Sequence, residues 1–166
     1  IVTVDGPIQP DDLGVTITHE HTFIDLRNWV EFPENAYQKG LASQSVSMGN
    51  LWYARRHRIE DNYELFDADV AEKEISRYFE AGGDTIVDVT PKGTGPAPKQ
   101  IRQMARKTGV QYVHGTAYYV RSSHPSSYDD MSEEAVEQEF VDDVTNGIGE
   151  TDVRAGIIGE IGLSAT

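Results

Sequence analysis

The sequence predicts an α/β fold in which a mainly parallel sheet is covered by helices. Stretches rich in β-branched residues alternate with amphipathic stretches along most of the chain, and this alternation is typical of parallel sheets. The predicted strands are nearly all apolar, as expected of strands buried on both faces. Their polar exceptions lie at the carboxyl ends, where α/β proteins place ligands and catalytic groups.

The elements follow one another as a strand, a long excursion and three helix–strand pairs. The alternating patterns predict strands over residues 14–21, 85–90, 111–120 and 155–162. Helical spacing predicts helices over residues 67–81, 99–108 and 133–146, with Asp67 and Ser132 as caps. In the first helix, the predicted buried face consists of Ala71, Ile75, Tyr78 and Phe79.

Residues 28–65 form an irregular, aromatic and polar segment that is too long for an ordinary connection, so we interpret it as a functional excursion or lid. The chain ends directly after its fourth predicted strand, with no helix to cover that strand. Bare sheet edges invite pairing or aggregation. We therefore expect residues 1–166 to be half of a larger domain.

Composition excludes several classes of protein. The formal net charge is −14, which disfavours general binding to nucleic acids or anionic membrane surfaces. There is no cysteine, so disulfides, thiolate zinc sites and a cysteine nucleophile are excluded. No apolar run approaches the roughly 18 residues that a membrane span needs. No signal peptide is visible, and we expect a cytoplasmic protein.

The tripeptide His19-Glu20-His21 is the strongest local signal. Side chains alternate along a strand, so both histidines should point to one face and Glu20 to the helix layer. Two neighbouring imidazoles can hold a divalent cation. The alternative is two histidines in a hydrogen-bonding role at a strand end.

Glu160 and Asp88 are carboxylates within apolar strand sequences. A buried carboxylate costs several kcal/mol unless it is paired or binds a metal; the alternative is that Glu160 reaches solvent. Because Glu160 and the two histidines all lie at carboxyl ends of strands, the pattern favours a shared metal centre. For Asp88 we expect a supporting role, accepting a hydrogen bond from a ring N–H or a backbone amide.

Tyr118 and Tyr119 end the third predicted strand and are expected at the mouth of a substrate pocket, with ordinary aromatic packing as the alternative. His114 lies earlier in that strand and is expected to be a satisfied core histidine. The glycine-rich loop over residues 93–98 lacks the full GxGxxG pattern, which excludes nucleotide binding there.

Taken together, these segments resemble the phosphotriesterase family of the amidohydrolase superfamily, which includes phosphotriesterase-like lactonases. The resemblance rests on residues 16–21, 85–90, 115–119 and 154–162, in that order. It implies a (β/α)₈ TIM barrel, of which this chain would supply about the first four βα units.

The resemblance also implies a binuclear centre of two divalent metal ions, which we expect to be zinc, with manganese, cobalt or iron as alternatives. His19 and His21 would bind the more buried ion, and Glu160 would bridge both where many relatives have a carbamylated lysine. Tyr119 would line the substrate pocket. The remaining ligands and the catalytic acid or base are expected beyond Thr166.

The implied function is hydrolysis of lactones or related esters through a metal-bridging hydroxide, with phosphotriesters as a side activity. We expect a small-molecule substrate and a homodimer, and we expect the 166-residue chain alone to be inactive. The alternative is a non-catalytic metal- or ligand-binding half-barrel that associates with a second copy.

Overall fold

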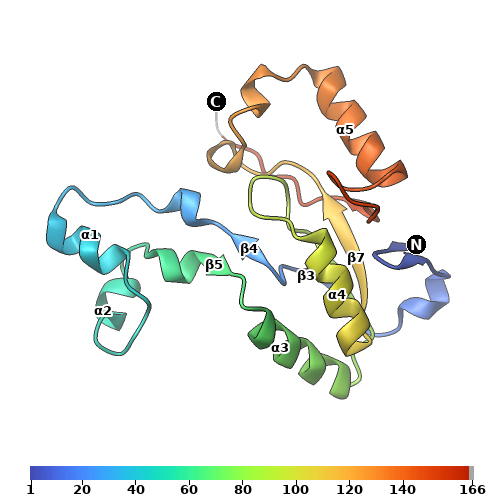
Figure 1. Cartoon of the computed structure of the whole chain (residues 1–166), viewed down its shortest axis with the longest axis horizontal. Coiled ribbons are helices and arrows are strands. Elements are labelled where there is room, and N and C mark those ends of the chain that lie inside the picture. The colour runs from blue at the N-terminus through green and yellow to red at the C-terminus, as the bar shows by residue number, and fades with distance from the viewer. Residues whose placement is uncertain (165–166) are drawn as a thin grey trace.

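A four-stranded parallel sheet forms the centre of the computed structural model, which describes residues 1–164 (Figure 1). The order of the strands is β3-β6-β7-β8, and each neighbouring pair is parallel. Their bounds are Thr16–Glu20, Thr85–Asp88, Gln111–Thr116 and Ile157–Ile158. Sequence order and spatial order agree, as in consecutive βα units of a barrel. The predicted α/β fold is thereby confirmed.

Three longer helices accompany the sheet: α3 (Ala68–Glu80), α4 (Pro98–Thr108) and α5 (Glu133–Thr145). Helices α3 and α4 lie side by side, and α4 and α5 both contact β7 (Figure 1). The predicted caps are present: the Asp67 carboxylate accepts from two backbone amides of the first turn of α3, and the Ser132 hydroxyl accepts from Ala135. Gly109 ends α4 with φ +82°, a left-handed conformation that favours glycine.

The main hydrophobic core lies between the sheet and helices α3 and α4. It includes the buried side chains of Phe23, Ile75, Ile86, Ile101, Met104, Tyr112 and Val153. Phe79 was expected on this buried face but is 48% exposed. It sits in the last turn of α3, next to Gly109, whose missing side chain leaves the edge of its ring uncovered.

All four strands are shorter than the sequence predicts, and β7 and β8 lose the most at their carboxyl ends. Strand β7 ends at Thr116 instead of residue 120, and β8 contains only Ile157 and Ile158. Strand β8 pairs with β7 alone, and both of its side chains are exposed. After Ile158 the chain leaves the sheet and turns across its carboxyl end. This turn places Glu160 in the site described below.

Residues 28–65 fold beside the sheet as a small unit on the left of Figure 1. It contains α1 (Ala36–Ala42), α2 (Leu51–Ala54) and β5 (Glu64–Leu65), with 3₁₀ turns at Arg27–Trp29 and Glu60–Tyr63. Strand β5 pairs with β4 (Ile24–Asp25). A separate cluster, formed by Leu41, Ala42, Tyr53 and Ile59, holds the unit together.

The amino-terminal residues pack beside β7. Strands β1 (Val2–Thr3) and β2 (Gly6–Pro7) form a short hairpin, followed by a 3₁₀ turn at Pro10–Leu13. The amide of Val4 donates to the carbonyl of Tyr112 and so ties the hairpin to β7. Within residues 1–164, no helix is long and apolar enough to cross a membrane.

Candidate metal centre

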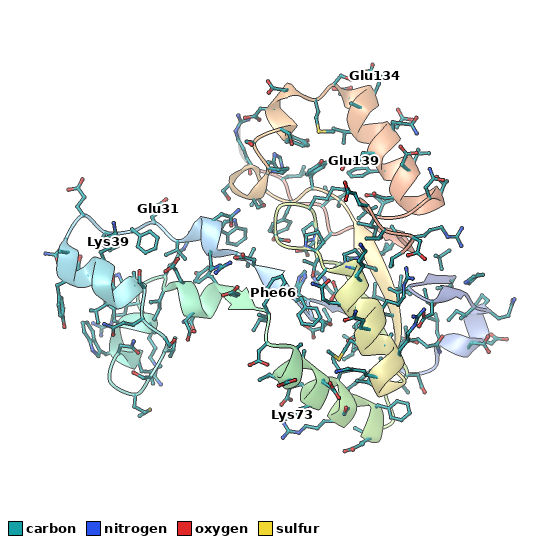
Figure 2. The ribbon with its side chains drawn as sticks, in the orientation of Figure 1. Glu31, Lys39, Phe66, Lys73, Glu134 and Glu139 are labelled. Atoms are coloured by element: carbon teal, nitrogen blue, oxygen red, sulfur yellow. The ribbon has the colours of Figure 1, made fainter. Side chains whose placement is uncertain are left out.

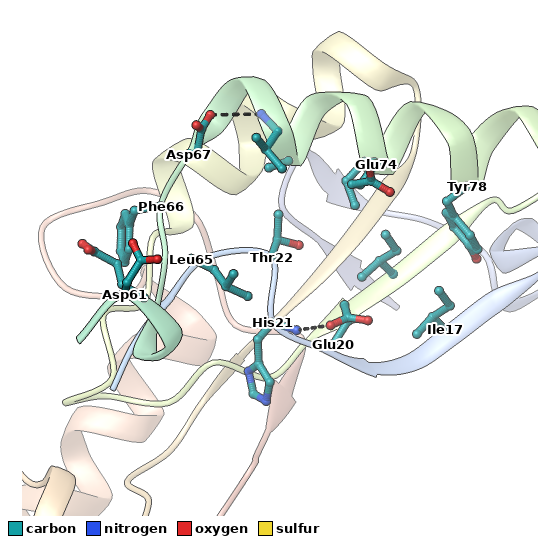
Figure 3. A pocket seen from close by; sticks show the side chains of 15 residues that line it. Ile17, Glu20, His21, Thr22, Asp61, Leu65, Phe66, Asp67, Glu74 and Tyr78 are labelled. Atoms are coloured by element: carbon teal, nitrogen blue, oxygen red, sulfur yellow. Dashed lines mark hydrogen bonds between the residues drawn. The ribbon is translucent and has the colours of Figure 1, made fainter. Parts of the chain in front are cut away.

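An extra residue in β3 determines which way its histidines point. Ile17 pairs with Ile86 and Glu20 pairs with Asp88, so β3 spans three residues where β6 spans two. Strict alternation from Ile17 would place His19 on the helix side of the sheet. The irregularity shifts the alternation by one, as β-bulges near functional sites do. Glu20 therefore lies beside the cavity next to α3, and the imidazole of His21 points away from α3 (Figure 3).

Glu160 reaches these histidines although β8 and β3 lie at opposite edges of the sheet. The amide of Gly159 donates to Thr116, and the amide of Glu160 donates to the carbonyl of Val89, just after β6. The chain therefore crosses over β7. Gly115 makes the crossing possible, because a Cβ at this position would lie 2.2 Å from the carbonyl oxygen of Gly159.

The three side chains converge at the carboxyl end of the sheet. One carboxylate oxygen of Glu160 lies 2.9 Å from Nε2 of His19, and the other lies 3.7 Å from Nε2 of His21. The Glu160 and His21 side chains are 24% and 22% exposed, and His19 is 58% exposed. The group is therefore partly enclosed and opens to solvent on the His19 side.

This donor set fits a divalent cation. One ligand atom from each of the three residues lies within 4.8 Å of the other two. Two imidazole nitrogens and a carboxylate oxygen suit zinc, manganese, cobalt or iron. The sequence predicted that these three residues meet, and the structure brings them together.

Asp88 supports the loops around the site through backbone amides. It is fully buried and accepts hydrogen bonds from the amides of Thr22, at 2.8 Å, and Thr90, at 3.1 Å. Of the two partners expected for Asp88, a ring N–H or a backbone amide, the structure shows the amide. The contact to an imidazole comes instead from Thr90, whose hydroxyl lies 3.0 Å from Nδ1 of His21.

The two tyrosines after β7 have different surroundings. The Tyr119 ring stacks on Trp29, with centroids 6.0 Å apart and planes 17° apart. The hydroxyl of Tyr118 donates to Glu139 of α5, and its ring packs on Tyr128. Both tyrosines border a cavity of about 600 Å³ whose lining residues do not include the three of the metal group.

Both tyrosines were expected at the mouth of a substrate pocket, with aromatic packing as the alternative. Consecutive residues of an extended chain point in opposite directions, so Tyr118 turns to α5 when Tyr119 turns to Trp29. Both rings make aromatic contacts, and a substrate-contacting role for Tyr118 and Tyr119 stays a prediction.

A buried ionic group that the sequence analysis missed holds α5 against the sheet. The ammonium of Lys92 lies 2.7 Å from carboxylate oxygens of both Glu139 and Asp143. Asp143 is nearly inaccessible and also accepts from the hydroxyl of Thr116. Figure 2 shows Glu139 on the side of α5 that faces the body of the protein. The spacing of the two acids, four residues apart on one helix, was the available signal.

Burial works against the charge of Lys92, but the hydrogen bonds to Asp143 and Glu139 outweigh it and raise the pKa of Lys92 above its ordinary value. His114 shows the opposite balance. It is completely buried, and burial lowers its pKa. Its Nδ1–H donates to the carbonyl of Gly115, and Nε2 is buried without a partner in the described part of the chain. It is thus a core histidine, as expected, but only one of its two ring nitrogens has a hydrogen-bond partner among the described residues.

Relatives among known proteins match this chain along nearly its whole length. The chain is 34% identical over 167 residues to an N-acetyltaurine hydrolase of Xenopus tropicalis. The aligned region covers 99% of this chain and 48% of the relative. The chain thus spans about half the length of the curated relatives it matches. N-acetyltaurine hydrolases of other animals and of Dictyostelium discoideum match over similar shares.

Two solved structures share the fold. A resiniferatoxin-binding protein from Rhodobacter sphaeroides superposes with a TM-score of 0.89 at 38% identity and covers 98% of this chain and 46% of its own. A mutant phosphotriesterase-like lactonase from Deinococcus radiodurans superposes with a TM-score of 0.65 at 25% identity, covering 95% and 43%. The half-barrel expected from the sequence is thereby confirmed.

A family model extends the agreement to every residue. The model of the phosphotriesterase family matches residues 1–166. The match includes the strand with both histidines, the crossing at Gly115 and the segment with Glu160. On these grounds the chain belongs to the phosphotriesterase family.

Proposed function

We propose that this chain forms the amino-terminal part of a metal-dependent hydrolase in which His19, His21 and Glu160 bind the metal. The observation that carries the proposal is that these three side chains, which come from the two opposite edges of the sheet, converge at its carboxyl end. The names of the relatives, among them N-acetyltaurine hydrolase and a phosphotriesterase-like lactonase, support hydrolysis as the reaction class.

Glu160 lies between the two histidines and contacts both of them. Each histidine turns Nε2 toward Glu160, and the two oxygens of Glu160 face different rings. A carboxylate in this position can bridge two cations, so we propose a centre of two ions, with zinc as the first candidate. When bound, such ions lower the pKa of water and polarise the oxygen of the bond to be cleaved. The catalytic acid or base is proposed to lie outside the described residues.

Lactones and related carboxylic esters are the first substrate class that we propose, with phosphotriesters as a side activity. N-acyl amino sulfonates are a second class, supported by the 34% identity to the Xenopus relative. A non-catalytic half-barrel has weaker support, because the curated relatives named as hydrolases match over the whole chain. A cytoplasmic location and a homodimer stay predictions.

The test combines metal content with turnover in the protein that contains residues 1–166. We expect about two divalent ions per chain by metal analysis, and hydrolysis of at least one member of a panel of lactones, esters, phosphotriesters and N-acetyltaurine. Glu160→Ala should lower the metal content and abolish turnover. His57→Ala, a histidine of the separate unit at residues 28–65, is the matched control and should change neither. Full metal loading without hydrolysis of any panel member would contradict the proposal.

A further inference from the structure

Thr90 connects His21 to the main chain of a neighbouring strand end. It is fully buried, and its hydroxyl oxygen lies 3.0 Å from Nδ1 of His21 and 3.2 Å from the carbonyl oxygen of Phe23. Its own amide donates to the buried carboxylate of Asp88. The hydroxyl is therefore held from both sides and has little freedom to turn away.

Counting protons settles the direction of these hydrogen bonds. A carbonyl oxygen can only accept, so the single hydroxyl proton of Thr90 goes to Phe23. The hydroxyl then faces His21 as an acceptor. Nδ1 of His21 must therefore carry the ring proton, and Nε2 keeps its lone pair. This is the nitrogen that faces Glu160, at 3.7 Å.

His19 lacks an equivalent restraint. Its side chain is the most exposed of the three, and none of the hydrogen bonds within residues 1–164 reaches its Nδ1. The two histidines of the tripeptide thus differ: His21 is held at Nδ1 by Thr90, whereas His19 is held at Nε2 by Glu160, at 2.9 Å. The restraint on His21 therefore leaves its Nε2 for a metal, and the restraint on His19 does not determine its tautomer in this way.

We infer that Thr90 is a positioning residue that fixes His21 as the Nδ1–H tautomer and so makes Nε2 its metal-binding atom before any metal arrives. The inference rests on the proposed function, because it assigns a purpose to the tautomer only at a metal centre. Groups that orient a histidine ligand in this way typically contribute about 10- to 100-fold to metal affinity.

The experiment compares Thr90→Val, which keeps the shape but loses the hydroxyl, with Thr90→Ser, which keeps the hydroxyl. Nitrogen NMR of protein labelled with ¹⁵N-histidine reports the tautomer without metal, and competition with a chromophoric chelator gives the affinity for zinc. We expect the parent and Thr90→Ser to show the Nδ1–H form of His21. Thr90→Val should lose this preference and bind zinc about 10- to 100-fold more weakly.

Thr145→Val is the matched control, because the Thr145 hydroxyl donates to a helix carbonyl on exposed α5; it should leave both readouts unchanged. If Thr90→Val does not fold, Thr90→Ala serves as the second variant without a hydroxyl. A folded variant of either kind with the parent's tautomer and zinc affinity would overturn the inference. A parent that shows the Nδ1–H form but binds no zinc would instead overturn the proposed function and leave the tautomer assignment standing.

Discussion

Replacing Gly115 with alanine is expected to damage the metal group without touching any ligand. The added Cβ would lie 2.2 Å from the carbonyl oxygen of Gly159 and 3.2 Å from Cα of Val89, whereas ordinary contacts lie at 3.4–4 Å. Both neighbours are backbone atoms, so no side chain can rotate to make room. The carbonyl of Gly159 would have to retreat by more than about 1 Å, and Glu160 follows it in the chain.

The size of the effect follows from two opposing contributions. Overpacking of a well-packed site costs about 1–3 kcal/mol. Alanine recovers about 0.4–1 kcal/mol because it restricts the unfolded chain. We therefore expect a net loss of about 1–2 kcal/mol in the free energy of unfolding. Displacing the Glu160 carboxylate, now 2.9 Å from His19, should also weaken zinc binding at least about 10-fold, or 1.4 kcal/mol.

Urea denaturation and zinc titration of Gly115→Ala measure both effects. Gly40→Ala is the matched control, because Gly40 lies in helix α1 and a Cβ there meets nothing within 4 Å. The control should keep the parent's zinc affinity and gain about 0.5–1 kcal/mol of stability. If Gly115→Ala keeps both the stability and the zinc affinity of the parent, the crossing over β7 is not what positions Glu160.

Three further predictions concern stability. Lys92→Met leaves the buried carboxylate of Asp143 without its cation and should cost about 3–5 kcal/mol in urea denaturation, whereas Lys73→Met on exposed α3 should change stability by less than about 0.5 kcal/mol. Burial keeps the pKa of His114 below its ordinary 6.5, so the unfolded chain binds this proton more readily and stability should fall as the pH drops below 6.5; His114→Gln should flatten that acid slope, and an unchanged slope would contradict the assignment. Asp67→Ala removes a cap that accepts from two amides and should lower the thermal midpoint through a loss of about 1 kcal/mol.

The sequence predicted the parts of the site that depend on residue type and period. The alternation of His19-Glu20-His21 and the lone carboxylate Glu160 were visible as chemistry at strand ends. The fold was predictable for the same reason, since alternating strand and helix periods admit few arrangements. The structure supplies the contacts that make these residues meet.

The parts that were missed depend on contacts between distant segments. Nothing in the sequence around Thr90 indicates that its hydroxyl faces His21, 69 positions away. The role of Gly115 is equally hidden, because it is set by a carbonyl of another strand end. The different partners of Tyr118 and Tyr119 are hidden in the same way, because Glu139 and Trp29 lie far from them in the sequence.

The extra residue in β3 has a consequence for anyone who would transplant this site. Odd-numbered side chains before the extra residue and odd-numbered side chains after it point to opposite faces of the sheet. Copying His19-Glu20-His21 onto a regular strand at the aligned position would present both imidazoles to the helix layer. Deleting Thr18 would remove the extra residue and its shift together, so both imidazoles should keep facing away from the helix layer. The site therefore depends on the spacing from Ile17 as well as on the tripeptide itself.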